Sequence, residues 1–514
     1  MIDTKALRQK ILDMAIRGKL VPQDPNDESA SVLLERIREE KQRLIKEGKI
    51  KKNKNDSVIF KGDDNRYYEK VGSQLKDITD ELPFEIPDGW SWTRFTQIVS
   101  FDLGKTPDRH NKKYWDDGKY PWFAISDLQE RATVNSTKEK ISAAALRDKF
   151  AGELIPQGTL LMSFKLTVGK TSILGIDAVH NEAIISIFPI ISEHEITRNF
   201  LLNALPVIVL CVKKREAVKG VTLNSSKLAA MFIPLPPLAE QQRIVSRVDE
   251  LLAQIDIIEQ NQADIDTLYE EFKKRTLTLA IQGKLVPQDP NDEPASVLLE
   301  RIRAEKKAKL GKKYVDSYIY KGDDNCYYEK VKDSVKEISD EIPFDIPKSW
   351  RWIRVDNLFQ HNTGKALNSS NTQGISHPYI TTTNVYWGYF NLEHIKEMPF
   401  TEDEFLKCSI VPGDLLVCEG GDIGRAAIWE NDISMCIQNH IHRLRAYYPV
   451  CTQFYYFAFF VYKSIGLIGG KGIGIQGVSS GALGKLIFPL PPLGEQERIV
   501  KQVEIILENL KDEG

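Results

Sequence analysis

The chain has 514 residues, of which 42% are hydrophobic and 27% are charged, and its formal net charge at pH 7 is −3. This composition is typical of a soluble globular protein with several domains and argues against a protein that is basic throughout. No apolar run approaches the roughly 18 residues that span a membrane, and the N-terminus lacks a signal-peptide layout. The six cysteines form no CxxC pair, so neither a zinc site nor a disulfide framework is indicated. We therefore expect a cytoplasmic protein that makes no membrane contact.

The chain contains an internal duplication, which becomes visible when the sequence is compared with itself. Residues 18–41 recur at 283–306 with two differences in 24 positions, and residues 56–71 recur at 316–331. Two further pairs match: ELPFEIPDGWSW with EIPFDIPKSWRW, ending at Trp92 and Trp352, and PLPPLAEQQRIV with PLPPLGEQERIV, beginning at Pro234 and Pro489. Two nearly identical scaffolds should bind the same kind of partner twice.

The segments between the matched blocks, residues 93–233 and 353–488, match poorly. Each contains short β-branched and aromatic runs separated by Gly, Asn and Asp, which predicts a mixed α/β domain. The clearest predicted strands are Thr159–Phe164, Ile184–Pro189 and Asp414–Cys418. Because the two inserts differ while their surroundings agree, we expect them to bind two different things. A DNA site with two unlike halves fits that arrangement.

A long helix is predicted from Ala239 to Gln282, a stretch without Gly or Pro. At about 1.5 Å per residue it could reach roughly 65 Å. Apolar residues step along it in a heptad pattern that predicts packing against another helix; the first are Ile244, Val248, Leu251, Ile255 and Ile258. The end of the chain repeats this seam with Ile499, Val503, Ile506 and Leu510. An ordinary core helix is the alternative interpretation.

The second copy of the helical block is split between the two ends of the chain. The tail 489–514 supplies its first part and residues 5–41 supply the rest, which predicts a circular, roughly twofold arrangement. Pro22, Pro25, Pro287 and Pro290 are expected to end the helices at matched places, and Ser31 and Ser296 to lie near the caps of two shorter helices. We read PLPPL as a stiff polyproline connector.

The sequence contains no convincing motif for catalysis, nucleotide binding or metal binding. Val168–Thr171 reads VGKT, but Phe164 occupies the position at which a phosphate-binding loop needs its first glycine. Asp63, Asp64 and their counterparts Asp323 and Asp324 fit a turn better than a metal site. We therefore expect no catalytic residue, no metal and no cofactor in this chain.

The exit motif PLPPLxEQxRIV followed by a heptad helix, present twice, together with entries such as Ile86–Trp90, resembles the specificity subunit of type I restriction–modification systems. The resemblance covers essentially the whole chain. It implies an α+β fold in which two mixed α/β target-recognition domains are separated by an antiparallel pair of long coiled-coil helices, with a pseudo-twofold internal repeat. The implied segments are an N-terminal helical region and linker (1–85), a first target-recognition domain (86–236), a central region with the long helix (237–345), a second target-recognition domain (346–491) and a C-terminal helix (492–514).

The resemblance also implies a function and partners. Each target-recognition domain would read one half of a bipartite, asymmetric sequence in double-stranded DNA, while the helices would set the spacer. The subunit would be non-catalytic and would recruit two modification subunits and the restriction subunits. Those partners would carry adenine-N6 methyltransferase and ATP-dependent endonuclease activities, and they would use S-adenosylmethionine, ATP and Mg²⁺.

Candidate DNA-binding residues follow from residue type, since Arg, Lys, Asn, Gln, Ser and Thr make most base and phosphate contacts. In the first insert they are Lys105, Thr106, Arg109, Lys112, Lys113, Ser126, Asp127, Lys165, Thr167 and Lys170. In the second insert they are Lys365, Asn368, Ser369, Thr381, Thr382, Asn384, Arg425, Gln438, Asn439, His440 and Lys471.

Two other function classes fit parts of the same pattern. A coiled-coil adaptor whose inserts bind proteins would also need a repeated scaffold. A single-chain methyltransferase would need cofactor motifs, and these are missing. Residues 86–236 carry 19 Lys/Arg against 15 Asp/Glu, and residues 346–491 carry 12 against 11. Such small surpluses predict modest DNA affinity for the chain alone.

Overall fold

The computed structural model describes residues 2–512 except 52–55, 192, 216–222, 368–372 and 469–478. The chain forms two compact units, residues 1–263 and 264–514. Both units contain helices and mostly antiparallel sheets, so the fold is mixed α+β, as the sequence predicts.

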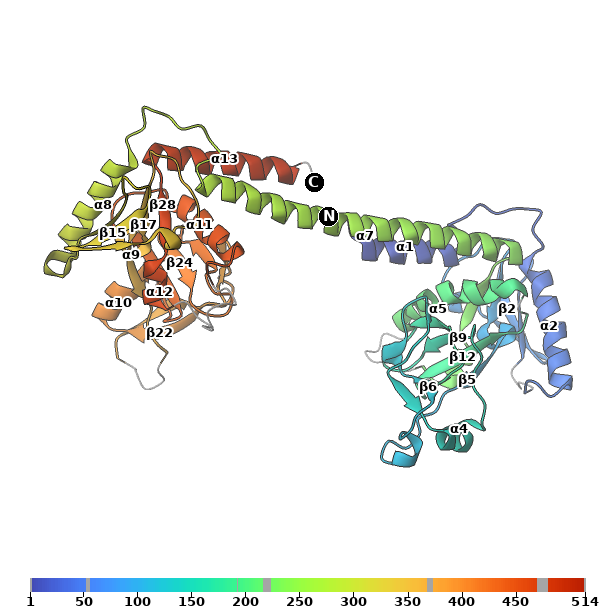
Figure 1. The fold of residues 1–514 in the computed structure, drawn as a ribbon. Helices are drawn as coiled ribbons and strands as arrows, with labels where there is room; N and C mark the ends of the chain where they lie inside the picture. Colours follow the sequence, from blue (N-terminus) through green and yellow to red (C-terminus); the bar gives the residue numbers. More distant parts are fainter. Residues whose placement is uncertain are drawn as a thin grey trace. The chain divides into compact units, whose positions relative to one another are not determined.

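The predicted long helix is present as α7 (Leu238–Ile281), 44 residues long and displaced by one residue from the expected bounds. Its first part belongs to the first unit. There α1 (Thr4–Ile16) packs against it in the antiparallel direction, since Arg8 contacts Glu259 while the later residue Gln23 contacts Glu240 (Figure 1).

The buried stripe in this part of α7 differs slightly from the predicted seam. Ile244, Val248 and Ile255 are buried as expected, but Leu252 is buried and Leu251 only half-buried. The helix faces both α1 and the core of the insert, so its apolar face is wider than the narrow stripe of a two-stranded coiled coil. Ile258, the last of the five positions named above, is half-buried.

In the second unit the tail helix α13 (Leu493–Asp512) packs against the last turns of α7 (Figure 1). Ile499 and Val503 share a core with Leu277, Ala280 and Ile281, while Ile506 and Leu510 are half-buried. The apolar residues of α1 play the matching part in the first unit, where Leu12, Ala15 and Ile16 are buried with Ile244 and Val248.

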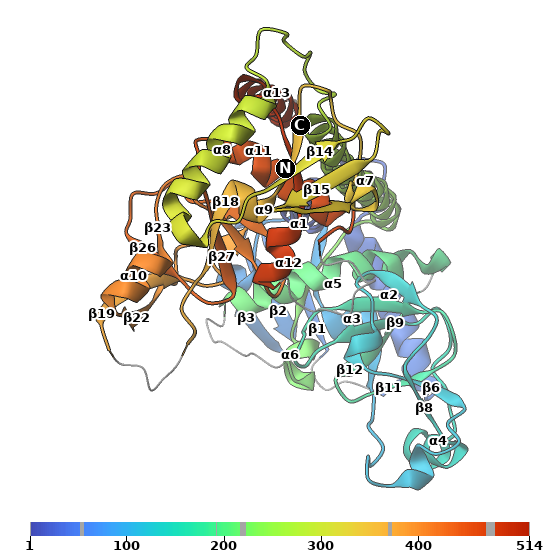
Figure 2. The ribbon, with the colours of Figure 1, turned by 60° about the vertical axis from the view of Figure 1, so that its left-hand side comes forward.

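A shorter helix and a three-stranded sheet follow in each copy. They are α2 (Ala30–Lys46) with β1 (Ser57–Lys61), β2 (Tyr67–Val71) and β3 (Gln74–Asp77), and α8 (Ala295–Leu310) with β14 (Ser317–Lys321), β15 (Tyr327–Val331) and β16 (Ser334–Glu337). The helices begin one residue earlier than Ser31 and Ser296 suggest, after Ser29 and Pro294. Figure 2 shows α8 beside β14 and β15.

The entry and exit strands of each insert pair with each other. In the first unit β4 (Ser91–Arg94) pairs with β13 (Phe232–Leu235), and in the second β17 (Arg351–Arg354) pairs with β28 (Ile487–Leu490). The prediction of a polyproline connector is therefore wrong for Pro234 and Pro489, which lie in these strands opposite Trp92 and Trp352. An edge strand tolerates proline because the missing N–H can face away from the partner strand.

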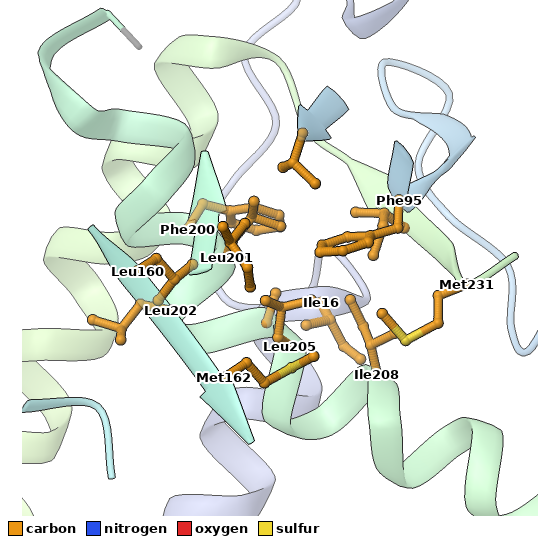
Figure 3. Packing of buried hydrophobic residues seen from close by; sticks show 14 of the residues in the cluster. Ile16, Phe95, Leu160, Met162, Phe200, Leu201, Leu202, Leu205, Ile208 and Met231 are labelled. Carbon is orange, nitrogen blue, oxygen red and sulfur yellow. The ribbon is translucent and has the colours of Figure 1, made fainter. Parts of the chain in front are cut away.

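The first insert is built on a five-stranded sheet. Its order is β5 (Val99–Leu103), β12 (Ile184–Pro189), β9 (Leu160–Ser163), β10 (Thr171–Leu174) and β7 (Ala132–Val134). Helix α5 (Ile196–Arg215) lies against it, and Leu201, Leu205 and Ile208 meet Leu160 and Met162 in the core (Figure 3). A smaller sheet of β11 (Val179–His180), β6 (Tyr120–Phe123) and β8 (Glu139–Ile141) lies next to α4 (Ala143–Phe150).

The second insert has two four-stranded sheets. One contains β18 (Phe359–Thr363), β27 (Ile441–Ala446), β24 (Leu415–Cys418) and β25 (Ala426–Ile428), and the other β22 (Lys396–Phe400), β19 (Ile375–Ile380), β26 (Met435–Ile437) and β23 (Ser409–Ile410). Helix α11 (Thr452–Ser464) is almost wholly buried against the first. The strands predicted around Leu160, Ile184 and Leu415 are all present.

Glycines, rather than the predicted prolines, end α1 and α7. Gly18 and Gly283 both have left-handed backbone angles, with φ of +65° and +69°. A Cβ on Gly18 would lie 2.3 Å from the Pro87 ring, and one on Gly283 would lie 2.5 Å from the Pro347 ring. Glycine therefore allows the helix end to approach the start of the insert.

We expect Gly18→Ala to destabilise the first unit by about 2–4 kcal/mol, because left-handed strain of roughly 1–2 kcal/mol adds to steric overlap of similar size. Gly48→Ala is the matched control, since Gly48 has φ of +72° and nothing within 4 Å. Urea unfolding of both variants measures the difference. Equal losses would show that contact with Pro87 contributes nothing.

Candidate nucleic-acid interface

A buried carboxylate fixes the start of α7 to the entry of the first insert. Glu240 is 1% exposed and accepts hydrogen bonds from Trp90 Nε1 at 2.9 Å and Gln23 Nε2 at 2.7 Å. The second unit repeats this contact: Glu495 accepts from Trp350 Nε1 at 2.9 Å and from Gln288 Nε2 at 2.5 Å. We call these two sets of three residues the anchors.

Ion pairs and amide contacts support each anchor. Arg243 pairs with Asp27 at 2.6 Å, and its counterpart Arg498 pairs with Asp292 at the same distance. Burial raises the pKa of Glu240 and of Glu495, although the hydrogen bonds from the tryptophan and glutamine and the nearby arginine oppose that shift. The free-energy cost of burying each carboxylate is therefore offset by its hydrogen bonds and by the nearby arginine.

The neighbouring glutamine ties the helix to the insert itself. Gln241 donates to the Pro236 carbonyl at 2.9 Å and accepts from Thr197 at the start of α5. Gln496 likewise donates to the Pro491 carbonyl and accepts from the Cys451 backbone N–H just before α11. The EQ pair of the exit motif thus fixes each insert to the scaffold. Sequence reasoning used this motif for recognition and missed its structural role; its signal is an acidic residue and a Trp at matched places in both copies.

The first candidate loop of the first insert, residues 104–113, is mostly exposed and is held by contacts with neighbouring segments. The Arg109 guanidinium lies over Trp115 and Trp122, 4.1 and 4.7 Å from the ring centroids, and pairs with Glu139. Lys105 donates to the Lys149 carbonyl at 2.9 Å. Lys112 is exposed, and Lys113 lies 3.7 Å from Asp148.

Glu182 brings two candidate loops together. Partial burial raises the pKa of Glu182, but the hydrogen bond from Thr106 and the charges of Lys165 and Arg109 outweigh it and lower the pKa overall. Lys165 lies in the turn between β9 and β10, and this turn starts next to Glu182, since the Phe164 N–H donates to the Ala183 carbonyl at 2.9 Å. Thr167 is exposed and Lys170 half-buried in the same turn, and Leu166 at its tip is 89% exposed.

Ser126 and Asp127 lie in a short turn after β6. Ser126 is exposed, whereas Asp127 accepts hydrogen bonds from the Ala124 N–H and the Thr137 hydroxyl, both at 2.9 Å. Asp127 therefore shapes the turn that presents Ser126.

In the second insert the candidate loops are joined by short contacts. Arg425 donates to the Thr382 carbonyl at 2.5 Å, and the Glu419 N–H donates to the His440 carbonyl at 2.9 Å. Asn439 N–H donates to the Lys365 carbonyl, and Gln438 forms a bridge with Lys365. His440 is exposed, while Gln438 and Asn439 are half-buried.

Three candidate side chains of the second insert are buried and form hydrogen bonds or ion pairs within the domain. Lys365 is 8% exposed, and its ammonium binds Glu404 at 2.6 Å and the Pro399 carbonyl at 2.7 Å. Asn384 is buried and accepts from the Thr381 N–H and hydroxyl, and Thr381 is buried with it. These residues hold loops in place. Asn368, Ser369 and Lys471 lie outside the described residues.

The described residues contain no group of three or more His, Cys, Asp or Glu side chains that could hold a metal ion. Within the same part of the chain, no helix combines the length and apolar character needed to cross a membrane. The Asp64 and Asp324 carboxylates instead accept from the Tyr68 and Tyr328 hydroxyls within their turns, which agrees with the predicted turn role.

The family model described as "Type I restriction modification DNA specificity domain" matches residues 87–267 and 347–512. The EcoAI specificity subunit of Escherichia coli is 27% identical, covering 98% of this chain and 89% of that protein. The EcoEI specificity subunit of Escherichia coli is 28% identical, covering 82% of this chain and 74% of that protein.

A solved structure shares the fold. It is described under "Structural basis underlying complex assembly and conformational transition of the type I R-M system" and covers 84% of this chain and 93% of its own, with a TM-score of 0.52 and 16% identity. Because the family model matches well over half of the chain, the protein belongs to the type I restriction–modification DNA specificity family.

We expect Glu240→Ala to destabilise the protein by about 2–4 kcal/mol, because two buried donors, on Trp90 and Gln23, lose their acceptor. Glu495→Ala should have the same effect in the second unit. Glu250→Ala, at an exposed position on the same helix, should change stability by less than about 0.5 kcal/mol. Chemical unfolding measures all three variants. A stability loss for Glu240→Ala no larger than that for Glu250→Ala would contradict the anchor.

Proposed function

We propose that this chain is the non-catalytic specificity subunit of a type I restriction–modification complex and reads a bipartite, asymmetric DNA sequence. Residues 86–236 and 346–491 serve as its two target-recognition domains. The single observation that carries this proposal is structural: two matching anchors, Glu240 and Glu495 with their partners, hold two inserts with different sheet topology. Two matching anchors that hold two different inserts fit a DNA site whose two halves differ in sequence.

The candidate loops supply the chemistry for DNA contact. In the first domain these are the exposed 104–113 loop and the β9–β10 turn, which provide Lys112, Lys113, Lys165 and Thr167 for phosphate and base contacts. In the second domain Thr382, Arg425 and His440 provide the corresponding groups, while Lys365 and Asn384 act by holding the loops. Ion pairs such as Arg109–Glu139 would have to exchange for phosphate contacts when DNA binds.

The helices are proposed to set the gap between the two half-sites. Helix α7 joins the two domains, and α1 and α13 each pack on it within their own unit. We propose that α13 and α1 follow one another along α7 and complete a circular, pseudo-twofold scaffold. Two modification subunits and the restriction subunits would dock on this scaffold and supply the chemistry with S-adenosylmethionine, ATP and Mg²⁺, so this chain itself needs no cofactor.

Exchange of residues 95–231 for the corresponding segment of a relative tests the assignment. This boundary leaves β4 and β13 in place, so the closing strand pair and the anchor are kept. Sequencing of methylated adenines in cells that carry the chimera should show one changed half-site and one unchanged half-site. The matched exchange of residues 355–486 should change the other half.

Changes in both half-sites, or in neither, after either exchange would contradict modular reading. Wild-type protein that assembles with its partners but shows no sequence-dependent DNA affinity would favour an adaptor whose inserts bind proteins. Such an adaptor would also lack the steep loss of affinity with rising salt that phosphate contacts cause.

A further inference from the structure

The two inserts share one short backbone arrangement that is not apparent from their sequences. In the first insert the Asp127 side chain accepts a hydrogen bond from the Ala124 N–H, which closes the turn after β6. Four residues later Arg131 has a left-handed backbone, with φ of +57°, and its N–H donates to the Thr171 carbonyl at the start of β10. Two contacts thus fix the course of the chain between them.

The second insert repeats both contacts at the same spacing. The Asn384 side chain accepts from the Thr381 N–H. Four residues later Gly388, with φ of +79°, donates its N–H to the Ala426 carbonyl at the start of β25. The backbone arrangement is therefore common to both inserts, while the side chains that it carries differ. The differing residues are Gln129, Glu130 and Arg131 in the first insert and Tyr386, Trp387 and Gly388 in the second.

In the second insert this element forms a short hairpin of β20 (Val385–Tyr386) and β21 (Tyr389–Phe390). One of its faces is fixed to the domain, because the Phe390 ring packs 5.1 Å from the ring of Trp429. Trp387 at the tip packs with its indole ring against an aromatic side chain of α11, 5.3 Å away. The hairpin is therefore held in one position on the second insert.

The other face of the hairpin carries two tyrosines to the surface. Tyr386 and Tyr389 are 38% and 57% exposed and form a cross-strand pair. Their rings are stacked, with centroids 4.9 Å apart and planes inclined by 11°. Successive side chains of a strand point to opposite faces, so the buried Val385 and the packed Phe390 direct both tyrosines outward. Such a rigid aromatic surface loses little conformational entropy when it binds a partner.

Arg425 lies beside the tyrosine pair. Its guanidinium is 5.4 Å from the centre of the Tyr386 ring and donates to the Thr382 carbonyl at 2.5 Å. Neither contact neutralises its charge. A guanidinium held against an aromatic ring can still use its outer N–H groups to bind a phosphate or the acceptor edge of guanine.

The carboxylates of the turn that carries Arg425 have other basic neighbours. Asp422 pairs with Lys463 at 3.1 Å, and Glu419 lies 3.7 Å from His440. No carboxylate among the described residues forms an ion pair with Arg425. The tyrosine pair thus borders a cation that an anionic partner can bind, which suits DNA better than a basic protein surface. Arg425 and His440 also belong to the proposed DNA-binding surface, so the two rings extend that surface.

We propose that the hairpin is a DNA-reading element of the second target-recognition domain. The ring faces of Tyr386 and Tyr389 lie against the half-site that this domain reads, and Tyr386 positions the Arg425 guanidinium for its contact with the same DNA. This inference rests on the proposed function, because it adds contact residues to a domain that is itself proposed to bind DNA.

The test uses the full chain assembled with its purified modification subunits. The probes are the duplex that the wild-type complex methylates and two versions of it, each with one half-site scrambled. The exchange of residues 355–486 identifies the second half-site. The variants are Tyr389→Ala, Tyr386→Ala and Arg425→Ala, with Tyr389→Phe and Tyr386→Phe as conservative changes. Phe60→Ala is the matched control, because it removes a ring that is 43% exposed and lies outside both inserts.

Tyr389→Ala should lower the preference for the intact over the scrambled second half-site about tenfold, while the preference for the first half-site stays unchanged. Both Phe variants and Phe60→Ala should bind as the wild type does, because the ring faces and not the hydroxyls make the contact. Tyr386→Ala and Arg425→Ala should each lower the same preference. Their combination should lose less than the product of the two effects, since Tyr386 acts partly through Arg425.

An unchanged preference in Tyr389→Ala would overturn the proposal, and so would an equal loss for both half-sites. Weaker assembly with the modification subunits, together with an unchanged DNA preference, would assign the rings to a protein contact and would also overturn it. If the proposed function is wrong, the wild-type complex has no preference for either intact half-site. If only the role of the hairpin is wrong, the wild type has both preferences and every tyrosine variant shares them.

Discussion

The structure depends on a buried carboxylate at the start of a helix. Glu240 accepts hydrogen bonds from Trp90, at the entry of the first insert, and from Gln23, which follows α1. One side chain thus joins the N-terminal segment, the insert and α7. Burial raises its pKa and the two donated hydrogen bonds oppose that shift, so loss of either donor would leave part of a buried carboxylate without a partner. Glu495 with Trp350 and Gln288 repeats the arrangement.

This constraint explains why the inserts can differ without disturbing the rest. Each insert leaves and rejoins the scaffold through one antiparallel strand pair, β4–β13 or β17–β28, next to the anchor. Inside the insert, further contacts with the scaffold come from Thr197 at the start of α5 and from Cys451 before α11, which bind Gln241 and Gln496. The first insert accordingly has one five-stranded sheet and a small sheet, whereas the second has two four-stranded sheets.

The repeated parts of the fold were predicted well, because their signals lie within one segment of the sequence or in the match between its two copies. The absence of Gly and Pro defined α7 to within one residue, and β-branched runs located β12 and β24. The prediction from sequence failed where contacts between distant segments determine burial or secondary structure. Leu252 is buried and Leu251 only half-buried because the insert widens the apolar face of α7, and Pro234 lies in a strand in which it pairs with Trp92.

The DNA-binding residues were harder to predict, because residue type does not show whether a side chain points to solvent or into the domain. Lys365 and Lys112 look alike as phosphate ligands, yet Lys365 is buried against Glu404 and Lys112 is exposed. Asn384 suits an adenine reader by residue type, but in the structure it binds the Thr381 backbone. The loops themselves do come together: Thr106 donates to Glu182 and the Phe164 N–H donates to the Ala183 carbonyl in the first insert, and Arg425 donates to the Thr382 carbonyl in the second.

We propose that a duplicated scaffold holds two unlike DNA readers at a spacing set by α7. Insertion of four helix-forming residues between Gln260 and Asp264, in the exposed middle of α7, tests it directly. At about 1.5 Å per helical residue and about 3.4 Å per base pair, the gap between the two methylated half-sites should grow by about two base pairs. Unchanged half-sites separated by the original gap would contradict the account.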